Sequence, residues 1–399
     1  MQKQSKITNA ISNMVTITST ADGIKYVNGS LTGELEFHVK QFSDMLDDSE
    51  YGCCFLASQY FTAESDFFKV NLKRDDGSKE VLGWMFHINL LSEDAAFYDG
   101  MDEFLLKYMH VGLHKLVEYS INQGLIKNGS GTLKDLSLSD DLIILVYRLS
   151  IINEVNIANL FPSLYDNGFV ATEEPDKVSS ANLRVNDYQK ERIDDFKSDP
   201  ARTCINLCLV APVFYNSLFV KSLFMTYLPA IDDDYLRYLM LYQIIEILMS
   251  VEYGNRYYEF VEKYGNDKRH NLMEKFGELS SEAKLIGKIY EIGATSTFHL
   301  DFNASAQQLL DKVDEGDFKD SPTFQDYMYK IRNMVVHNLS LMRDYPKEMN
   351  RIADVYEIAI ADLIHRTAIE VKRDKKLFVI DMNKSYEEIK GMLYGAYHS

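Results

Sequence analysis

Hydrophobic and polar positions alternate along much of the first hundred residues, which predicts β-strands. The alternation is partial in Met14–Thr20 and in Leu35–Val39. Two further strand segments, Phe67–Lys73 and Glu80–Leu91, flank Asp75-Asp76-Gly77-Ser78, whose residue types are typical of a hairpin turn. The beginning of the chain is therefore predicted to be rich in strands.

The spacing of apolar residues becomes helical from Asp102 to about Asn122. A second helix is predicted from Ser139 to about Leu160, because this segment is apolar around Ile143, Ile144, Val146 and Tyr147. Residues 172–200 are polar and rich in charge, which predicts a domain boundary. We place an N-terminal α+β domain at residues 1–195 and a C-terminal helical domain at residues 200–399.

After residue 200, every element is predicted to be helical. The segment Tyr235–Leu248 is apolar nearly all round, which predicts a central place in a helical bundle. Asp232-Asp233-Asp234 precede it and supply a cap and negative charge at the helix start.

Three more helices follow in the C-terminal half. One is predicted from near Ser280 to Gly293, and the last from about Met349 to Val371. The helix between them begins at Ser321-Pro322, with Ser321 as cap and Pro322 in the first turn, and ends near Asn338. The predicted fold class is therefore α+β, with a mixed N-terminal region followed by an all-α bundle.

The composition is that of a protein that can build a core: of 399 residues, 46% are hydrophobic and 26% are charged. The formal net charge of −18 argues against a broad nucleic-acid-binding surface. It leaves room for a small local site, because a few arginines at a cleft can hold one phosphate. An acidic chain of this kind favours particular RNAs or a basic partner over long duplexes.

Four cysteines do not make a disulfide framework at this length, so we predict reduced and mostly buried thiols in a cytoplasmic protein. Cys204 and Cys208 are four residues apart, as on one face of a helix. The chain begins MQKQSKITNA and shows no long apolar stretch of a secretory signal. Residues 203–220 lack charged side chains, but Asn206 and Pro212 favour a buried segment over a membrane span.

The most informative motif is Arg332-Asn333-Met334-Val335-Val336-His337, which spans about one and a half helical turns. An arginine can hold a phosphate through two parallel hydrogen bonds, and a histidine can move a proton near neutral pH. The apolar side chains that share one sector of this helix are Phe324, Tyr327, Met328, Ile331 and Val335. Asn333 and His337 share the opposite face, and Arg332 lies on the flank. Arg332, Asn333 and His337 are therefore the candidate catalytic residues.

This motif, with arginine followed directly by asparagine and then by histidine five positions after the arginine, resembles the signature of HEPN-superfamily ribonucleases. The order of helices around it is also similar: an apolar helix with an internal Glu246 lies upstream, and a long amphipathic helix lies downstream. The group found in bacterial defence and toxin proteins is the most similar. The resemblance covers roughly residues 200–375.

The resemblance implies a helical bundle that forms a homodimer and brings two motif helices together. The composite cleft cuts RNA in single-stranded or loop regions without metal or cofactor, giving 2′,3′-cyclic phosphate and 5′-hydroxyl ends. His337 acts on the 2′-hydroxyl or the leaving oxygen, Arg332 holds the phosphate, and Asn333 orients the phosphate or His337. Leu339 stands where one subgroup carries a tyrosine that is adenylylated, so that form of control is not expected.

Two other readings remain open. In the first, a HEPN-type fold binds RNA or a protein without cutting, which the acidic charge favours, whereas the complete Arg–Asn–His set favours cleavage. In the second, the N-terminal half is a nucleotide- or metal-dependent enzyme. Otherwise that half is expected to sense a trigger, such as a phage product or a regulatory protein.

Three weaker candidates lie elsewhere. His110 and His114 are one helical turn apart, as in metal-binding pairs, but no glutamate directly follows His110. Asn128-Gly129-Ser130-Gly131-Thr132 is rich in glycine but lacks the lysine of a phosphate-binding loop. Lys268-Arg269-His270 is an auxiliary basic spot for RNA, and an ordinary surface charge cluster is its alternative. No metal site is predicted.

Overall fold

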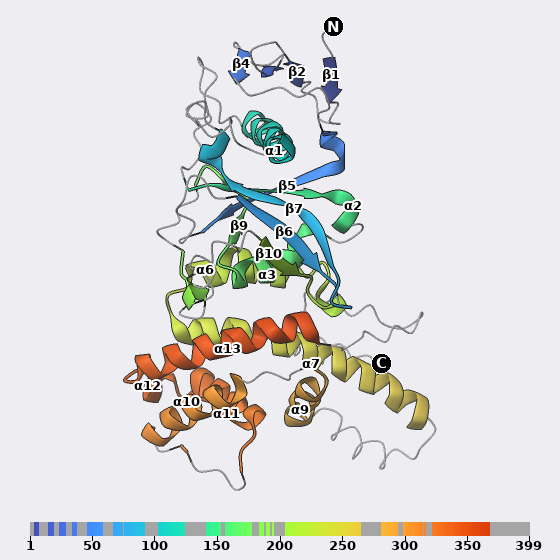
Figure 1. The fold of residues 1–399 in the computed structure, drawn as a ribbon. Helices are drawn as coiled ribbons and strands as arrows, with labels where there is room; N and C mark the ends of the chain where they lie inside the picture. Colours follow the sequence, from blue (N-terminus) through green and yellow to red (C-terminus); the bar gives the residue numbers. More distant parts are fainter. Residues whose placement is uncertain are drawn as a thin grey trace. The chain divides into compact units, whose positions relative to one another are not determined.

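The protein has an α+β fold, seen in a computed structural model (Figure 1). The structure describes residues 4–7, 15–19, 24–28, 34–37, 46–58, 67–74, 76–91, 103–123, 141–152, 156–177, 183–186, 189–191, 194, 204–264, 281–293, 298–313, 315–316 and 321–367. The chain divides into two compact units. Unit 1 comprises residues 1–157, 167–185 and 190–207, and unit 2 comprises residues 158–166, 186–189 and 208–399. The sequence predicts one boundary near residues 195–200, whereas these units exchange segments between residues 158 and 207.

Unit 1 is built on two sheets. The smaller one is a four-stranded meander of β1 (Gln4–Ile7), β2 (Val15–Ser19), β3 (Ile24–Asn28) and β4 (Glu34–Phe37). The larger one has the order β10-β6-β7-β8-β5-β9. Its strands are β5 (Tyr51–Ala57), β6 (Phe67–Lys73), β7 (Lys79–His87), β8 (Ile143–Arg148), β9 (Val170–Thr172) and β10 (Cys204–Cys208). The β6–β7, β7–β8, β8–β5 and β5–β9 pairs are all antiparallel.

The predicted hairpin between β6 and β7 is confirmed. Gly77 has φ of +81°, a left-handed conformation that glycine adopts without steric cost. Its backbone N–H donates to the carbonyl of Arg74 at 2.9 Å, which closes the turn.

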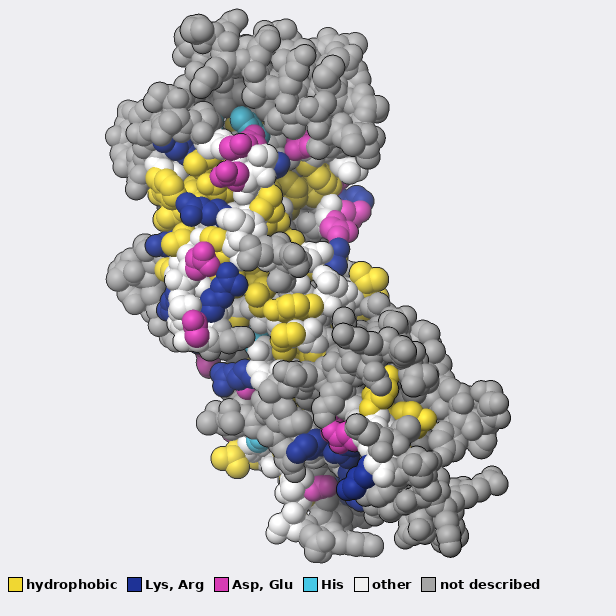
Figure 2. Space-filling view, turned by 90° about the vertical axis from the view of Figure 1, so that its right-hand side faces the viewer, with side chains coloured by type: hydrophobic (Ala, Val, Ile, Leu, Met, Phe, Trp, Pro, Cys, Tyr) yellow, Lys and Arg dark blue, Asp and Glu magenta, His cyan; other side chains and the backbone are white. Residues whose placement is uncertain are grey.

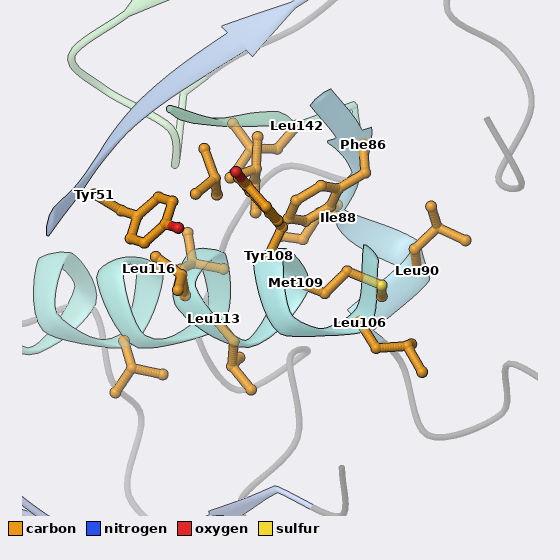
Figure 3. Packing of buried hydrophobic residues seen from close by; sticks show 14 residues of the cluster. Tyr51, Phe86, Ile88, Leu90, Leu106, Tyr108, Met109, Leu113, Leu116 and Leu142 are labelled. Atoms are coloured by element: carbon orange, nitrogen blue, oxygen red, sulfur yellow. The ribbon is translucent and has the colours of Figure 1, made fainter. Parts of the chain in front are cut away.

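Helix α1 (Glu103–Asn122) covers one face of the larger sheet (Figure 3). Leu106, Met109 and Leu116 are at most 2% exposed and pack in one cluster with Phe86 and Leu142. A leucine fully buried in this way contributes about 1.5–3 kcal/mol. This cluster is the core of unit 1 on the α1 side.

The helix predicted for Ser139–Leu160 is wrong. Its apolar centre is strand β8, which lies between β7 and β5, followed by the short helix α2 (Leu149–Ile152). Ile143, Ile144, Leu145 and Val146 are each 0% exposed. A strand buried on both faces loses its alternation and reads as a continuous apolar run, which spacing alone does not distinguish from a buried helix.

Unit 2 is helical. Its elements are α3 (Phe161–Asp166), α5 (Leu218–Ser222), the π-helix η8 (Leu223–Tyr227), α6 (Leu228–Ala230), α7 (Asp234–Tyr264), α9 (Glu282–Gly293), α10 (Phe298–Lys312), α11 (Phe324–His337), α12 (Leu339–Met342) and α13 (Pro346–Arg366). Helices α7 and α13 lie side by side, and α10 packs against both α13 and α11. Within the described residues, no helix is long and apolar enough to cross a membrane.

Two details of the helical half differ from the prediction. Strand β10 lies after residue 200, so Cys204 and Cys208 share one face of a strand rather than of a helix. All four cysteines are free, but only Cys54 is buried, so the prediction of mostly buried thiols is wrong. Ile205 and Leu207 alternate with the exposed Asn206, which is typical of a strand, but β10 is only five residues long and its signal is therefore weak.

The cap of α7 is one of the three predicted aspartates, whereas the cap of α11 lies two positions after the predicted Ser321. The Asp233 carboxylate accepts from the backbone N–H groups of Tyr235 and Leu236, both at 2.9 Å, which agrees with a cap among the three aspartates. Thr323, not Ser321, caps α11, and it forms a reciprocal capping box with Asp326. The Thr-x-x-Asp pattern satisfies two backbone N–H groups, those of Thr323 and Asp326.

A buried ionic network joins α7 to α13. Arg237 is 0% exposed, and its guanidinium nitrogens lie 2.8 Å from Asp234, 2.6 Å from Asp354 and 3.4 Å from Glu357. The amide of Asn186 also donates to Glu357, at 2.5 Å. Three carboxylates and an amide thus surround one buried cation in unit 2.

Candidate functional site

Helix α11 carries the motif and is fixed by its apolar face. Its buried residues are Phe324, Tyr327, Met328, Ile331, Met334 and Val335. The hydroxyl of Tyr238 on α7 donates to the carbonyl of Met328 at 2.8 Å. The ring of Phe324 stacks on His299 of α10, with centroids 4.2 Å apart. These contacts leave the polar flank of α11 for Arg332, Asn333 and His337.

Arg332 is held by three neighbours. Its Nη1 donates to the side-chain oxygen of Asn333 at 3.0 Å. Its Nη2 lies 3.8 Å from a carboxylate oxygen of Glu246 on α7. The guanidinium also lies over the ring of Tyr242, 5.6 Å from the centroid, within the range of a cation–π interaction. With a side chain 24% exposed, Arg332 is positioned by the bundle yet remains accessible to a ligand.

Tyr242 adds a neutral hydroxyl beside this arginine. Burial raises the pKa of Tyr242, the charges of Glu282 and Glu246 raise it further, and Arg332 lowers it. Its hydroxyl oxygen is buried and has no hydrogen-bond partner in the described part of the chain. A neutral phenol of this kind keeps its proton, so Tyr242 offers Arg332 the electron-rich face of its ring without placing a negative charge beside the guanidinium.

His337 is exposed at the last residue of α11, and Asn333 is half-buried one turn earlier. The helix ends there because Asn338 adopts a non-helical backbone conformation. The backbone N–H of Asn338 still donates to the carbonyl of Met334 at 2.8 Å, which is the last hydrogen bond of the helix. Among the described residues, no hydrogen bond joins His337 to Arg332 or Asn333. One chain therefore carries a guanidinium and an imidazole on the same helix without joining them by a hydrogen bond among the described residues.

Two residues of this environment, Glu246 and Tyr242, were not among the sequence candidates. A signal was available for Glu246, because it is a charged residue within an otherwise apolar helix, a position that usually has a partner. Nothing in the sequence connects Tyr242 to Arg332, since the two lie on different helices, α7 and α11.

The other candidates are distant from this motif in the sequence. In unit 1, His114 Nδ1 lies 2.5 Å from a carboxylate oxygen of Asp48, and His110 is 2% exposed. No group of three potential metal ligands occurs among the residues with a described placement. The glycine-rich Asn128–Thr132 and the basic Lys268–His270 lie outside the described residues.

Models of protein families, curated proteins and solved structures were compared with this chain, and none of them matches. The chemistry of the site is therefore argued from its own side chains: a guanidinium positioned over a buried tyrosine ring, an amide and an exposed imidazole. This set can bind a phosphate group and exchange a proton with it.

Proposed function

We propose that this protein is a metal-independent endoribonuclease of the HEPN kind, with Arg332, Asn333 and His337 as its catalytic residues. The observation that carries the proposal is the pairing on α11 of an exposed His337 with an Arg332 held by Glu246, Tyr242 and Asn333. Arginine geometry matches two phosphate oxygens, and imidazole transfers protons near neutral pH. RNA supplies both a phosphate and an internal nucleophile.

The proposed reaction balances without a cofactor. The 2′-oxygen attacks the adjacent phosphorus and gives up its proton to an imidazole, while the bond from phosphorus to the 5′-oxygen breaks. A second imidazole donates a proton to that leaving oxygen. Arg332 stabilises the charge that develops on the phosphate. The products are a 2′,3′-cyclic phosphate and a 5′-hydroxyl.

The need for two imidazoles leads us to propose a homodimer through unit 2. Each chain carries one His337, and that residue is exposed. Val336 and Leu341 beside it are 45% and 50% exposed, which makes the surface around His337 partly apolar. A symmetric pair of α11 helices would bring two histidines and two arginines to one phosphate. We place this activity in the cytoplasm, in antiphage defence or as a toxin.

Cleavage is expected to persist in EDTA. Purified protein is incubated with total RNA in EDTA and in Mg²⁺, and the product ends are analysed. We expect nearly equal rates and 2′,3′-cyclic phosphate ends in both, because protons and charge are handled by side chains. The His337→Ala protein, purified in the same way, controls for contaminating nuclease. A rate that collapses in EDTA and returns with Mg²⁺, or 3′-hydroxyl ends, contradicts the proposal.

The homodimer is expected to show in light scattering as twice the chain mass of 46.0 kDa. Val336→Asp with Leu341→Asp should lower the mass to one chain and abolish cleavage, because two charges enter the surface around His337. Leu218→Asp is the control, since Leu218 is 65% exposed on α5 and should change neither. A double variant that is monomeric and fully active would rule out the composite site.

A further inference from the structure

Strand β6 of unit 1 has one buried and one polar face. Val70 and Leu72 are 0% exposed, whereas Lys69 and Asn71 are half-buried and Lys73 is exposed. Alternate residues of a strand share a face, so Lys69, Asn71 and Lys73 lie in a row, about 6.6 Å from one to the next.

The neighbouring strand β7 extends this row. Lys79 is exposed and lies directly opposite Lys73, and Trp84 lies directly opposite Lys69. Cross-strand partners point to the same face of a sheet, and like charges placed opposite each other destabilise the pair. The lysine pair at this corner therefore favours an anion between or above the two ammonium groups.

Strand β10 completes the face on the other side. The amide of Asn71 donates to Cys204 Sγ at 2.7 Å and to the side-chain oxygen of Asn206 at 3.4 Å. Burial raises the pKa of Cys204, while the charges of Lys69 and Lys79 lower it, so both ammonium groups lie near this thiol. Asn206 is exposed, with Ile205 and Leu207 buried on the opposite face.

Among the residues that the structure describes, none supplies a counter-charge to the three lysines. In the described part of the structure, none of them forms an ion pair or a hydrogen bond; Glu80, the nearby acid of β7, pairs with Arg74 at 3.0 Å instead. On the face shown in Figure 2, basic and acidic side chains are interspersed. Three unpaired lysines on a chain of net charge −18 form a local basic surface.

An aromatic group borders this surface. Trp84 is in edge-to-face contact with Phe104 of α1, with centroids 6.5 Å apart, and Phe104 is 39% exposed. Trp84 itself is half-buried and packs against the core cluster, so Phe104 is the more exposed of the two rings. Exposed rings beside a row of cations are the combination that binds single-stranded nucleic acid, because bases stack on the rings while cations follow the phosphates.

We propose that the surface formed by Lys69, Asn71, Lys73, Lys79 and Asn206 binds a single strand of nucleic acid, with Phe104 and Trp84 receiving a base at its end. An acidic peptide would satisfy the lysines but would leave the rings without a stacking partner. That the strand is RNA rests on the proposed function of α11. Unit 1 would then select or hold the RNA that unit 2 cleaves.

The test uses the full chain and a fluorescein-labelled 2′-O-methyl RNA of about 20 nucleotides, which lacks the attacking hydroxyl and therefore reports binding alone. Anisotropy is measured over a range of NaCl concentrations for the wild type and for K69A/K73A/K79A. The control is K177A/K263A/K347A, which removes the same charge from exposed positions outside this surface. Single-stranded DNA and poly-glutamate of equal length are run beside the RNA.

We expect the surface variant to bind RNA at least about 10-fold more weakly, and its slope of log affinity against log salt to fall by about 2, for three lost phosphate contacts. Phe104→Ala should weaken binding without changing that slope. The control should bind as the wild type does. The inference is overturned if the surface variant and the control lose affinity equally, if neither does, or if poly-glutamate binds as tightly as RNA through the same lysines.

The outcomes separate this inference from the nuclease proposal. Loss of binding in the surface variant, together with no cleavage of ordinary RNA by the wild type, would support the binding surface and contradict the nuclease. Unchanged binding in the surface variant, together with cleavage that needs His337, would do the reverse. Tighter binding of DNA than RNA would support the surface and contradict RNA as its ligand.

Discussion

Replacing His337 by alanine is expected to lower the rate of RNA cleavage by about 10²–10⁴-fold, the usual contribution of a general acid or base. Arg332→Lys should lower it by about 10²–10³-fold although the charge is kept, because lysine cannot hold two phosphate oxygens in parallel. Single-turnover kinetics on a short labelled RNA measures both effects. The free energy of unfolding of His337→Ala should stay within about 0.5 kcal/mol of the wild type, since the side chain is exposed.

Ser340→Ala is the matched control for these variants. Ser340 is exposed on α12, three residues after His337, and lies outside the motif. Its activity should equal that of the wild type. Full cleavage by His337→Ala would disprove the catalytic role, and full cleavage by Arg332→Lys would show that the arginine acts only as a charge. Glu246→Gln tests the positioning of Arg332 separately, and we expect a higher KM for RNA from it.

Replacing Arg237 by methionine is expected to destabilise unit 2 by about 3–5 kcal/mol, because removing one partner leaves buried carboxylates without their cation. Asp354 and Glu357 are 7% and 3% exposed, and each of them pairs with Arg237. Equilibrium unfolding in urea measures the loss. If Asp354 and Glu357 are changed to leucine as well, most of the stability should return, since an apolar replacement of a whole buried ion network is often neutral.

Arg256→Met provides the comparison. Arg256 lies on the same helix and pairs with Glu252 at 2.9 Å, but its side chain is 22% exposed. A partly exposed pair of this kind contributes about 1 kcal/mol or less. If Arg237→Met costs no more than Arg256→Met, the buried network does not stabilise the contact between α7 and α13.

Several of the elements that the sequence predicted well have one solvent-facing side. Helices α1, α9 and α11 each show clear helical spacing, and strand β6 is bounded by a glycine turn. Strand β8 was mistaken for a helix because sheet neighbours on both sides and cover on both faces remove its alternation. Burial on all sides is a property of the tertiary structure, so the local pattern does not report it.

Local sequence patterns predict the candidate site only in part, as they do the fold. The core face of α11 followed from the spacing of its apolar residues, although Met334 also belongs to it. That Arg332 meets Glu246 and Tyr242 depends on how α7 packs against α11, which no local pattern encodes. Arg237 carried a usable signal, since an arginine within an apolar helix needs acidic partners, but its partners lie on α13 and in the first turn of α7.

The exchange of segments between the two units has a consequence for how the protein can be divided. Residues 158–166 and 186–189 belong to unit 2 but precede residues 190–207 of unit 1 in the chain. Asn186 supplies a hydrogen bond to the buried Glu357, and Gln189 donates to the carbonyl of Tyr165 at 2.6 Å. A single proteolytic cut or gene fusion point therefore cannot release an intact helical half. A fragment that begins at residue 208 would lack both segments, and with them the hydrogen bonds that they supply to the helical half.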